Sequence, residues 1–238
     1  MNSIYNLRKQ NKGFSLVELI IAVSVGTIVA GAVGSLIAFS IRMYSNQSMN
    51  TIVQKELQMT VNQVVDSAQS ASWFAFNNVG TKTEYVAFGK IITSEDDGKN
   101  YYVGELFASG DDDGSAAGRF NIYMERYSVG ALEVTDEADA KSKLAGKVSS
   151  IKEEKNLLGK DANKFFIDFA KSSGGTYQNF DDTNHTFSNP IGFDFAIGFE
   201  RTGFGGKEVS KEVKDEVTLR NKIKSNLYLG SQEYLPEE

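Results

Sequence analysis

The sequence has no cysteine, only two prolines and a single histidine in 238 residues. The absence of cysteine excludes disulfides, thiolate zinc sites, cysteine nucleophiles and C-x-x-C redox pairs. The one histidine, His185, lies in a polar stretch without a serine or cysteine motif, and we interpret it as an exposed loop residue. No catalytic constellation is recognisable among the remaining residue types. We therefore expect a protein that is not an enzyme and that uses no cofactor.

Charged residues are missing from one long stretch, positions 19–41, within an apolar run that covers positions 14–41. At 1.5 Å per residue this run can cross a hydrocarbon core of about 30 Å. It is too long for a secretory signal, whose apolar region has roughly 7 to 15 residues. Arg8, Lys9 and Lys12 precede the run and Arg42 alone follows it, which places the amino terminus in the cytoplasm and the following body outside it.

Glu18 is an exception at the start of this apolar run. A carboxylate in lipid is costly unless it has a partner, so it either meets a cation or reaches toward the cytoplasmic interface. The residues around it, Gly13-Phe14-Ser15-Leu16-Val17-Glu18, follow a short basic leader and open the span. This arrangement resembles the class III signal of type IV pilins and type II secretion pseudopilins.

The resemblance implies a set of functional residues. A prepilin peptidase is expected to remove the leader, residues 1–13, between Gly13 and Phe14 and to methylate the new amine of Phe14. Glycine suits the cleavage position because it lets an enzyme approach the backbone closely. Glu18 is then expected to neutralise the terminal amine of a neighbouring subunit during filament assembly. The implied partners are the peptidase, other pilin or pseudopilin subunits, the inner-membrane assembly platform and the membrane.

After the span, apolar residues recur every three or four positions, which indicates an amphipathic helix over residues 42–72. The stripe consists of Met49, Val53, Leu57, Val61, Val65 and Ala68. Together with the span, 14–41, this predicts one nearly continuous helix over residues 14–72. Many pilins carry a kinking proline about twenty residues past the cleavage site, but this chain has Ser35 there.

The remainder, residues 73–238, is predicted to be a β-rich globular domain. Strands are expected at 84–92, 101–108, 119–127, 165–170 and 193–200. Asp97-Gly98 indicates a hairpin turn between the first two, and clean alternation over 119–127 predicts a sheet with one buried face. Residues 131–160 are expected to form a surface helical insertion and 172–190 a long polar loop. The fold class is α+β, with an antiparallel sheet packed on the long helix, as in pilins.

The segment Val217-Thr218-Leu219-Arg220-Asn221 resembles the ending of J-type pseudopilins and PilW-type minor pilins. Removal of the leader would leave 238 − 13 = 225 residues, a size that suits a minor subunit.

Two acidic clusters, positions 95–98 and 111–114, do not complete a calcium-loop pattern, so we expect turns and no metal site. The glycines at 203, 205 and 206 match no phosphate-binding loop. Residues 43–238 carry 21 basic and 30 acidic side chains, a balance of −9 that disfavours nucleic-acid binding. Lys141, Lys143 and Lys147 lie among acidic residues and are interpreted as a solvated helix face.

The preferred interpretation is therefore a structural minor pilin or pseudopilin, N-methylated, anchored by one helix and assembled into a type IV pilus or a type II secretion pseudopilus at the cell surface. The alternative is a single-pass, signal-anchored surface protein or exported enzyme in which the motif occurs by chance. Such an anchor would keep residues 1–13, so cleavage separates the two.

Overall fold

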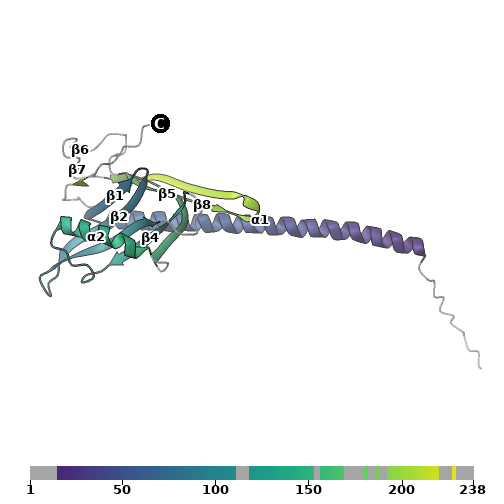
Figure 1. Ribbon diagram of the computed structural model, residues 1–238, viewed down its shortest axis with the longest axis horizontal. Helices are drawn as coiled ribbons and strands as arrows, with labels where there is room; N and C mark the ends of the chain where they lie inside the picture. The colour runs from purple at the N-terminus through teal and green to yellow at the C-terminus, as the bar shows by residue number, and fades with distance from the viewer. Residues whose placement is uncertain are drawn as a thin grey trace, which may run out of the picture. The chain divides into compact units, whose positions relative to one another are not determined.

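The structure is a computed structural model that describes residues 15–110, 118–152, 156–168, 180–181, 186–187, 192–219 and 227–228. The chain divides into two compact units, Met1–Gln47 and Ser48–Glu238. Helix α1, Leu16–Ser70, is continuous through the boundary and has 55 residues (Figure 1). The sequence predicted such a helix, and its end at Ser70 lies within two residues of the expected end.

In the first unit α1 is apolar and exposed. None of the side chains in its most apolar 18-residue window is buried within the protein, and the helix is long enough to cross a membrane. Large apolar side chains such as Ile20, Ile28 and Phe39 are all more than half exposed. An apolar surface of this length is unstable in water, so it requires another apolar environment.

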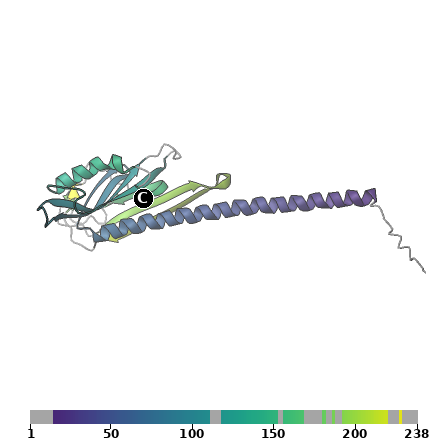
Figure 2. The same cartoon turned by 90° about the horizontal axis from the view of Figure 1, so that it is seen from below.

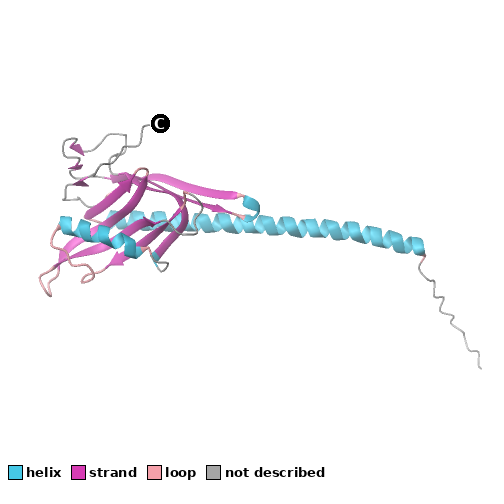
Figure 3. Cartoon of the chain, viewed as in Figure 1, coloured by secondary structure: helices cyan, strands magenta, loops and turns pink. Residues whose placement is uncertain are grey.

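The second unit contains an antiparallel sheet, whose strands are magenta in Figure 3. It has seven strands in the order β1-β2-β3-β4-β5-β8-β9. Their bounds are β1 Trp73–Val79, β2 Lys82–Thr93, β3 Asn100–Gly110, β4 Phe120–Tyr127, β5 Leu157–Asp168, β8 Gly192–Thr202 and β9 Glu208–Thr218. A smaller sheet pairs β10 (Leu227–Tyr228), β7 (Thr186–Phe187) and β6 (Phe180–Asp181). Helix α2, Glu137–Ile151, lies between β4 and β5 in the sequence, and a short 3-10 helix η2, Phe204–Gly206, joins β8 to β9.

One face of the large sheet packs on the outer part of α1. Val53 and Val64 are completely buried against aromatic side chains of the strands, including Phe107 and Phe165. The buried line of α1 consists of Val53, Leu57, Thr60, Val64, Ser67 and Ala68. Three residues of the predicted stripe, Val53, Leu57 and Ala68, belong to this buried line. Val61 and Val65 lie at its edge, and two hydroxyl residues, Thr60 and Ser67, lie inside it.

Over strands β1 to β4 the opposite face of the sheet is also buried, which corrects the expectation of one buried face. Helix α2 covers it, and Ala140, Leu144 and Ile151 are completely buried against strands β1 to β4. Figure 2 shows α2 and the outer part of α1 on opposite sides of this sheet. Among the described residues of the expected insertion, 131–160, the α-helix covers Glu137–Ile151. It forms a second core with the sheet because its apolar residues fall on one side.

A tyrosine fills a gap in this second core. Gly89 on β2 lies directly opposite Gly104 on β3, and the Tyr102 ring packs where their side chains would be. The Tyr102 hydroxyl donates hydrogen bonds to the carbonyl oxygens of Phe88 and Glu105, at 3.0 and 3.1 Å. Burial raises the pKa of Tyr102, so it remains a neutral donor. A larger residue at either glycine would collide with this ring.

The five predicted strands are present, except that positions 169–170 of the predicted strand 165–170 lie outside the described residues. The turn at Asp97-Gly98 joins β2 to β3. Strand β1, most of β9 and the first half of β5 were not predicted. The segment expected to be a long loop, 172–190, lies mostly outside the described residues but includes β6 and β7. Of the segment 217–221, the first two residues end β9, and the last two lie outside the described residues.

Candidate functional site

Two of the three residues proposed from the amino-terminal motif, Gly13 and Phe14, lie outside the described residues. The third, Glu18, lies in the first turn of α1. Ser15 immediately precedes the helix and is described with it. The local geometry at the start of α1 can therefore be given from Ser15 onward.

Ser15 and Glu18 form a reciprocal cap on this helix. The backbone N–H of Ser15 donates to Glu18 Oε2 at 3.0 Å, and the backbone N–H of Val17 donates to Ser15 Oγ at 3.3 Å. This is the capping-box arrangement of a hydroxyl residue followed three positions later by glutamate. It satisfies two backbone donors that the helix itself leaves free, and it places a negative charge at the positive end of the helix dipole.

The cap changes the interpretation of Glu18. We expected its carboxylate either to meet a cation or to reach toward the cytoplasmic interface, but within a single chain it already has a backbone partner. The sequence contained the signal for this contact, because Ser-x-x-Glu before an apolar run is a helix-start pattern. The contact is compatible with later pairing to an amine, since a carboxylate accepts several hydrogen bonds.

The polar side chains within the apolar part of α1 are satisfied by the helix itself. The hydroxyls of Ser24, Thr27, Ser35 and Ser40 each donate to a backbone carbonyl three or four residues earlier, at 2.7 to 2.8 Å. Hydroxyls bonded in this way leave no unsatisfied donor in a hydrocarbon environment. The segment from Leu19 to Ile41 therefore has the properties of a membrane anchor or signal.

The comparison with family models agrees with this part of the chain. Residues 8–34 match the prokaryotic N-terminal methylation motif. The match includes the basic part of the leader from Arg8 onward, the Gly13 to Glu18 string and more than half of the apolar run. No curated protein and no solved structure matched the chain. The prepilin-type signal is thus supported by an independent comparison, and the globular domain is characterised by its structure.

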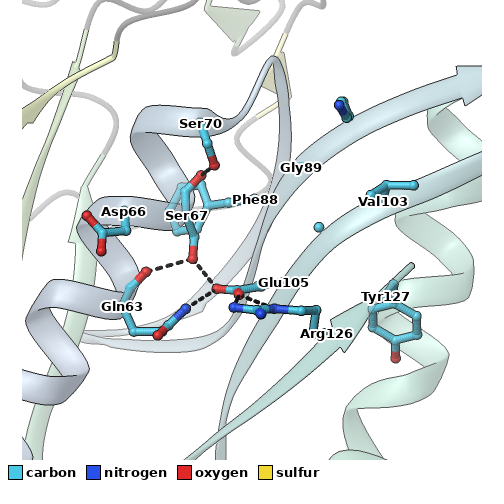
Figure 4. Close-up of a pocket in the computed structure, with 12 residues that line it drawn as sticks. Gln63, Asp66, Ser67, Ser70, Phe88, Gly89, Val103, Glu105, Arg126 and Tyr127 are labelled. Carbon is cyan, nitrogen blue, oxygen red and sulfur yellow. Dashed lines mark hydrogen bonds and ion pairs between the residues drawn. The ribbon is translucent and has the colours of Figure 1, made fainter. Parts of the chain in front are cut away.

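A second candidate site is a cavity of about 480 Å³ beside the last turns of α1 (Figure 4). Strands β2, β3 and β4 form its other wall. Its central group is Glu105 on β3, which is only 7% exposed although it is charged. Arg126 on β4 and Lys90 on β2 supply cations, and Asp66 on α1 supplies a second carboxylate.

Both oxygens of Glu105 are occupied. Gln63 Nε2 donates to Oε2 at 2.7 Å, and the Ser67 hydroxyl donates to the same oxygen. Arg126 Nε donates to Oε1 at 2.7 Å, and its Nη2 also donates to this oxygen. A buried carboxylate that accepts four hydrogen bonds has both oxygens occupied and is not free to act as a base or nucleophile. Its clearest role is to join α1 to the sheet.

The acidic turn at 95–98 and the glycine run at 203–206 have structural roles. Asp97 accepts from the Tyr101 hydroxyl at 2.6 Å and from the Lys99 N–H at 3.0 Å, and these bonds lower its pKa. Gly205 and Gly206 have φ of 77° in the turn between β8 and β9, which explains the glycine run. No cluster of three or more possible metal ligands occurs among the described residues. His185 and the acidic run 111–114 lie outside them.

The lysines of α2 belong to a mixed-charge face. Lys143 Nζ pairs with Asp139 at 2.8 Å one helical turn earlier, and Asp136 caps the helix by accepting from the Asp139 N–H at 2.8 Å. The pKa of Asp139 is lowered mainly by its hydrogen bond with the Lys143 side chain. This arrangement agrees with the solvated helix face expected from the sequence.

Proposed function

We propose that this chain is a structural, membrane-anchored subunit of a pilin-like filament. The observation that carries the proposal is the prepilin-type signal at residues 8–34, placed at the start of a long helix whose outer part packs on an antiparallel sheet. Signal and fold are independent features of the chain. A surface protein or exported enzyme that carried the motif by chance would have no reason to have this fold as well.

Processing follows from the signal. A prepilin peptidase cuts after Gly13 on the cytoplasmic side of the membrane and methylates the amine of Phe14. The leader 1–13 is then lost, residues 14–41 form the membrane span, residues 42–72 the amphipathic part of the helix, and residues 73–238 the globular domain. Cleavage creates a cation at Phe14, close in sequence to Glu18. In the filament Glu18 pairs with the amine of a neighbouring subunit.

We further propose that the subunit is a minor one, of the J-type or PilW-type. Two features support this: the Val-Thr-Leu-Arg-Asn string at 217–221 and a processed length of 225 residues (238 − 13). The first two residues of the string end β9, which pairs with β8 at the edge of the sheet. The filament is a type IV pilus or a type II secretion pseudopilus, and the globular domain is extracytoplasmic.

The decisive experiment is the intact mass of the protein purified from membranes of cells with an active prepilin peptidase. The expected species is residues 14–238 with one added methyl group. Recovery of an unprocessed chain that begins at Met1 would overturn the proposal and support the signal-anchor alternative, which retains its leader.

A pair of variants at Gly13 provides the control. Gly13→Ala adds only a methyl group and should be cut in part, whereas Gly13→Leu should block cleavage because its side chain obstructs approach to the backbone. Both variants keep the leader charges and the span, so their membrane insertion should be unchanged. Equal processing of the two would show that the cut does not occur at this glycine.

A further inference from the structure

Helix α1 contains a segment of weak helix formers between its apolar part and its packed part. Residues 45–51 read Ser-Asn-Gln-Ser-Met-Asn-Thr, so five of these seven residues are Ser, Asn or Thr. These residue types lower helix stability because their short polar side chains compete for backbone hydrogen bonds or lose rotamer freedom. No segment of comparable composition occurs elsewhere in α1.

The surroundings of residues 45–51 stabilise the helix less than the surroundings of the segments before and after them do. The charge-free run ends at Ile41, and in lipid a helix keeps its backbone hydrogen bonds because no water competes for them. The first buried residue of α1 is Val53, from which the core holds the helix. The side chains at positions 45–51 are half-buried or exposed. The helix there is stabilised mainly by its own propensity, which its Ser, Asn and Thr residues lower.

Two structural observations fall on the same residues. The boundary between the two compact units lies between Gln47 and Ser48, inside the segment. Asn46 Oδ1 is an enclosed acceptor that has no hydrogen-bond partner among the described residues. Local opening would expose this oxygen to water, which can donate to it, so opening is less costly here than in a segment whose buried polar atoms are all satisfied.

We propose that residues 45–51 form a hinge in α1. The segment opens transiently, and the apolar span and the globular unit change their relative direction while each keeps its own structure. The sequence has no proline in α1, so a hinge of this kind arises from accumulated weak propensity and not from a fixed kink. The proposal uses the proposed function only in placing the apolar part of α1 in a membrane.

Distance measurements between spin labels test the hinge directly. The chain has no cysteine, so the pair Phe39→Cys and Gln54→Cys can be labelled alone in the full chain reconstituted in nanodiscs. These positions are separated by 15 residues across the segment, which corresponds to about 22 Å in a straight helix. The matched pair Gln54→Cys and Gln69→Cys has the same separation within the packed part. We expect a broad distance distribution for the first pair and a narrow one for the second.

A helix-stabilised variant makes the test specific. Ser45→Ala, Ser48→Ala and Asn50→Ala together raise the propensity of the segment and should narrow the distribution of the straddling pair. Gln58→Ala with Asn62→Ala, in the packed part, should leave it unchanged. An equally narrow distribution for both pairs in the parent chain would overturn the hinge. Because the labels report on helix geometry, that result would be distinct from a failure of leader cleavage.

Discussion

At the scale of single residues, Glu18 is bound to its own helix before any neighbour is present. Its carboxylate accepts the Ser15 N–H at 3.0 Å and completes the cap with the Ser15 hydroxyl. The charge is therefore stabilised twice, by a hydrogen bond and by the helix dipole. An amine created at Phe14 by cleavage would add a charged partner to a carboxylate that already faces the helix start.

Variants at Glu18 can separate capping from charge pairing. Glu18→Gln keeps an acceptor for the Ser15 N–H but removes the charge, whereas Glu18→Ala removes both. If pairing with a neighbouring amine drives assembly, we expect both variants to be cleaved at near-normal levels and both to be lost from purified filaments. The measurement is the fraction of mature subunit found in sheared filaments relative to membranes.

The glutamine variant decides between the two roles. Normal incorporation of Glu18→Gln together with loss of Glu18→Ala would mean that the cap alone matters. Normal incorporation of both would contradict any assembly role for Glu18.

The position of Glu18 was evident from the sequence because a carboxylate is conspicuous at the start of an apolar run. Its contact with Ser15 is local and was also predictable from the Ser-x-x-Glu spacing. Glu105 was different: its partners Gln63 and Ser67 precede it by 42 and 38 residues and lie on another element. No local pattern specifies such a pairing, which depends on how α1 lies across β3.

At the scale of elements, the Glu105 cluster joins α1 to the sheet. The donors come from α1 and β4, and the acceptor is on β3, so the three elements are held together by one buried carboxylate. Loss of a partner of a buried charge costs more than loss of an exposed pair, because the remaining charge stays desolvated.

A comparison of two ion pairs tests this. Arg126→Ala leaves Glu105, whose side chain is 9% exposed, without its cation, and we expect a loss of about 1–3 kcal/mol in the free energy of unfolding. Lys99→Ala removes a cation from Glu133, whose side chain is 53% exposed, and should leave the free energy of unfolding nearly unchanged because water screens such a pair. Thermal unfolding of the two variants in detergent compares them. Equal losses would contradict a special role for the buried carboxylate.

Sequence patterns identified elements by their strongest periodicity. The alternation in β4 was sufficient to predict that strand, and the turn before β3 was sufficient to predict the hairpin of β2 and β3. The 55-residue α1 was predicted nearly to its end. The first half of β5, Leu-Leu-Gly-Lys-Asp-Ala, was missed because it contains glycine and two charges, and Asp161 adopts a φ of 59° at an irregular pairing with β4. The buried role of α2 was missed because its composition is dominated by Ala, Lys and Ser, and only four of its residues face the core.

At the scale of the whole molecule, the sheet of the globular unit has a helix on each face. The two helices differ in their place in the chain. Helix α2 lies wholly within the globular unit, whereas the outer part of α1 is continuous with the apolar segment of the same helix. The core under α1 contains the phenylalanines at positions 74, 88, 107, 165, 193 and 199, all at most 2% exposed. This core depends on residues 53–68 of α1 to exclude water.

Truncation at two points tests this dependence. A chain that begins at Met43 loses most of the apolar surface of α1 but keeps every buried residue of the helix, so we expect it to be soluble, monomeric and folded. A chain that begins at Trp73 loses Val53, Leu57 and Val64, exposes the aromatic core and should aggregate. Size-exclusion chromatography and urea unfolding of both proteins provide the comparison. If the shorter chain is equally stable and monomeric, α1 is not part of the domain core, and the architecture described for the globular unit is wrong even if the amino terminus is processed as proposed.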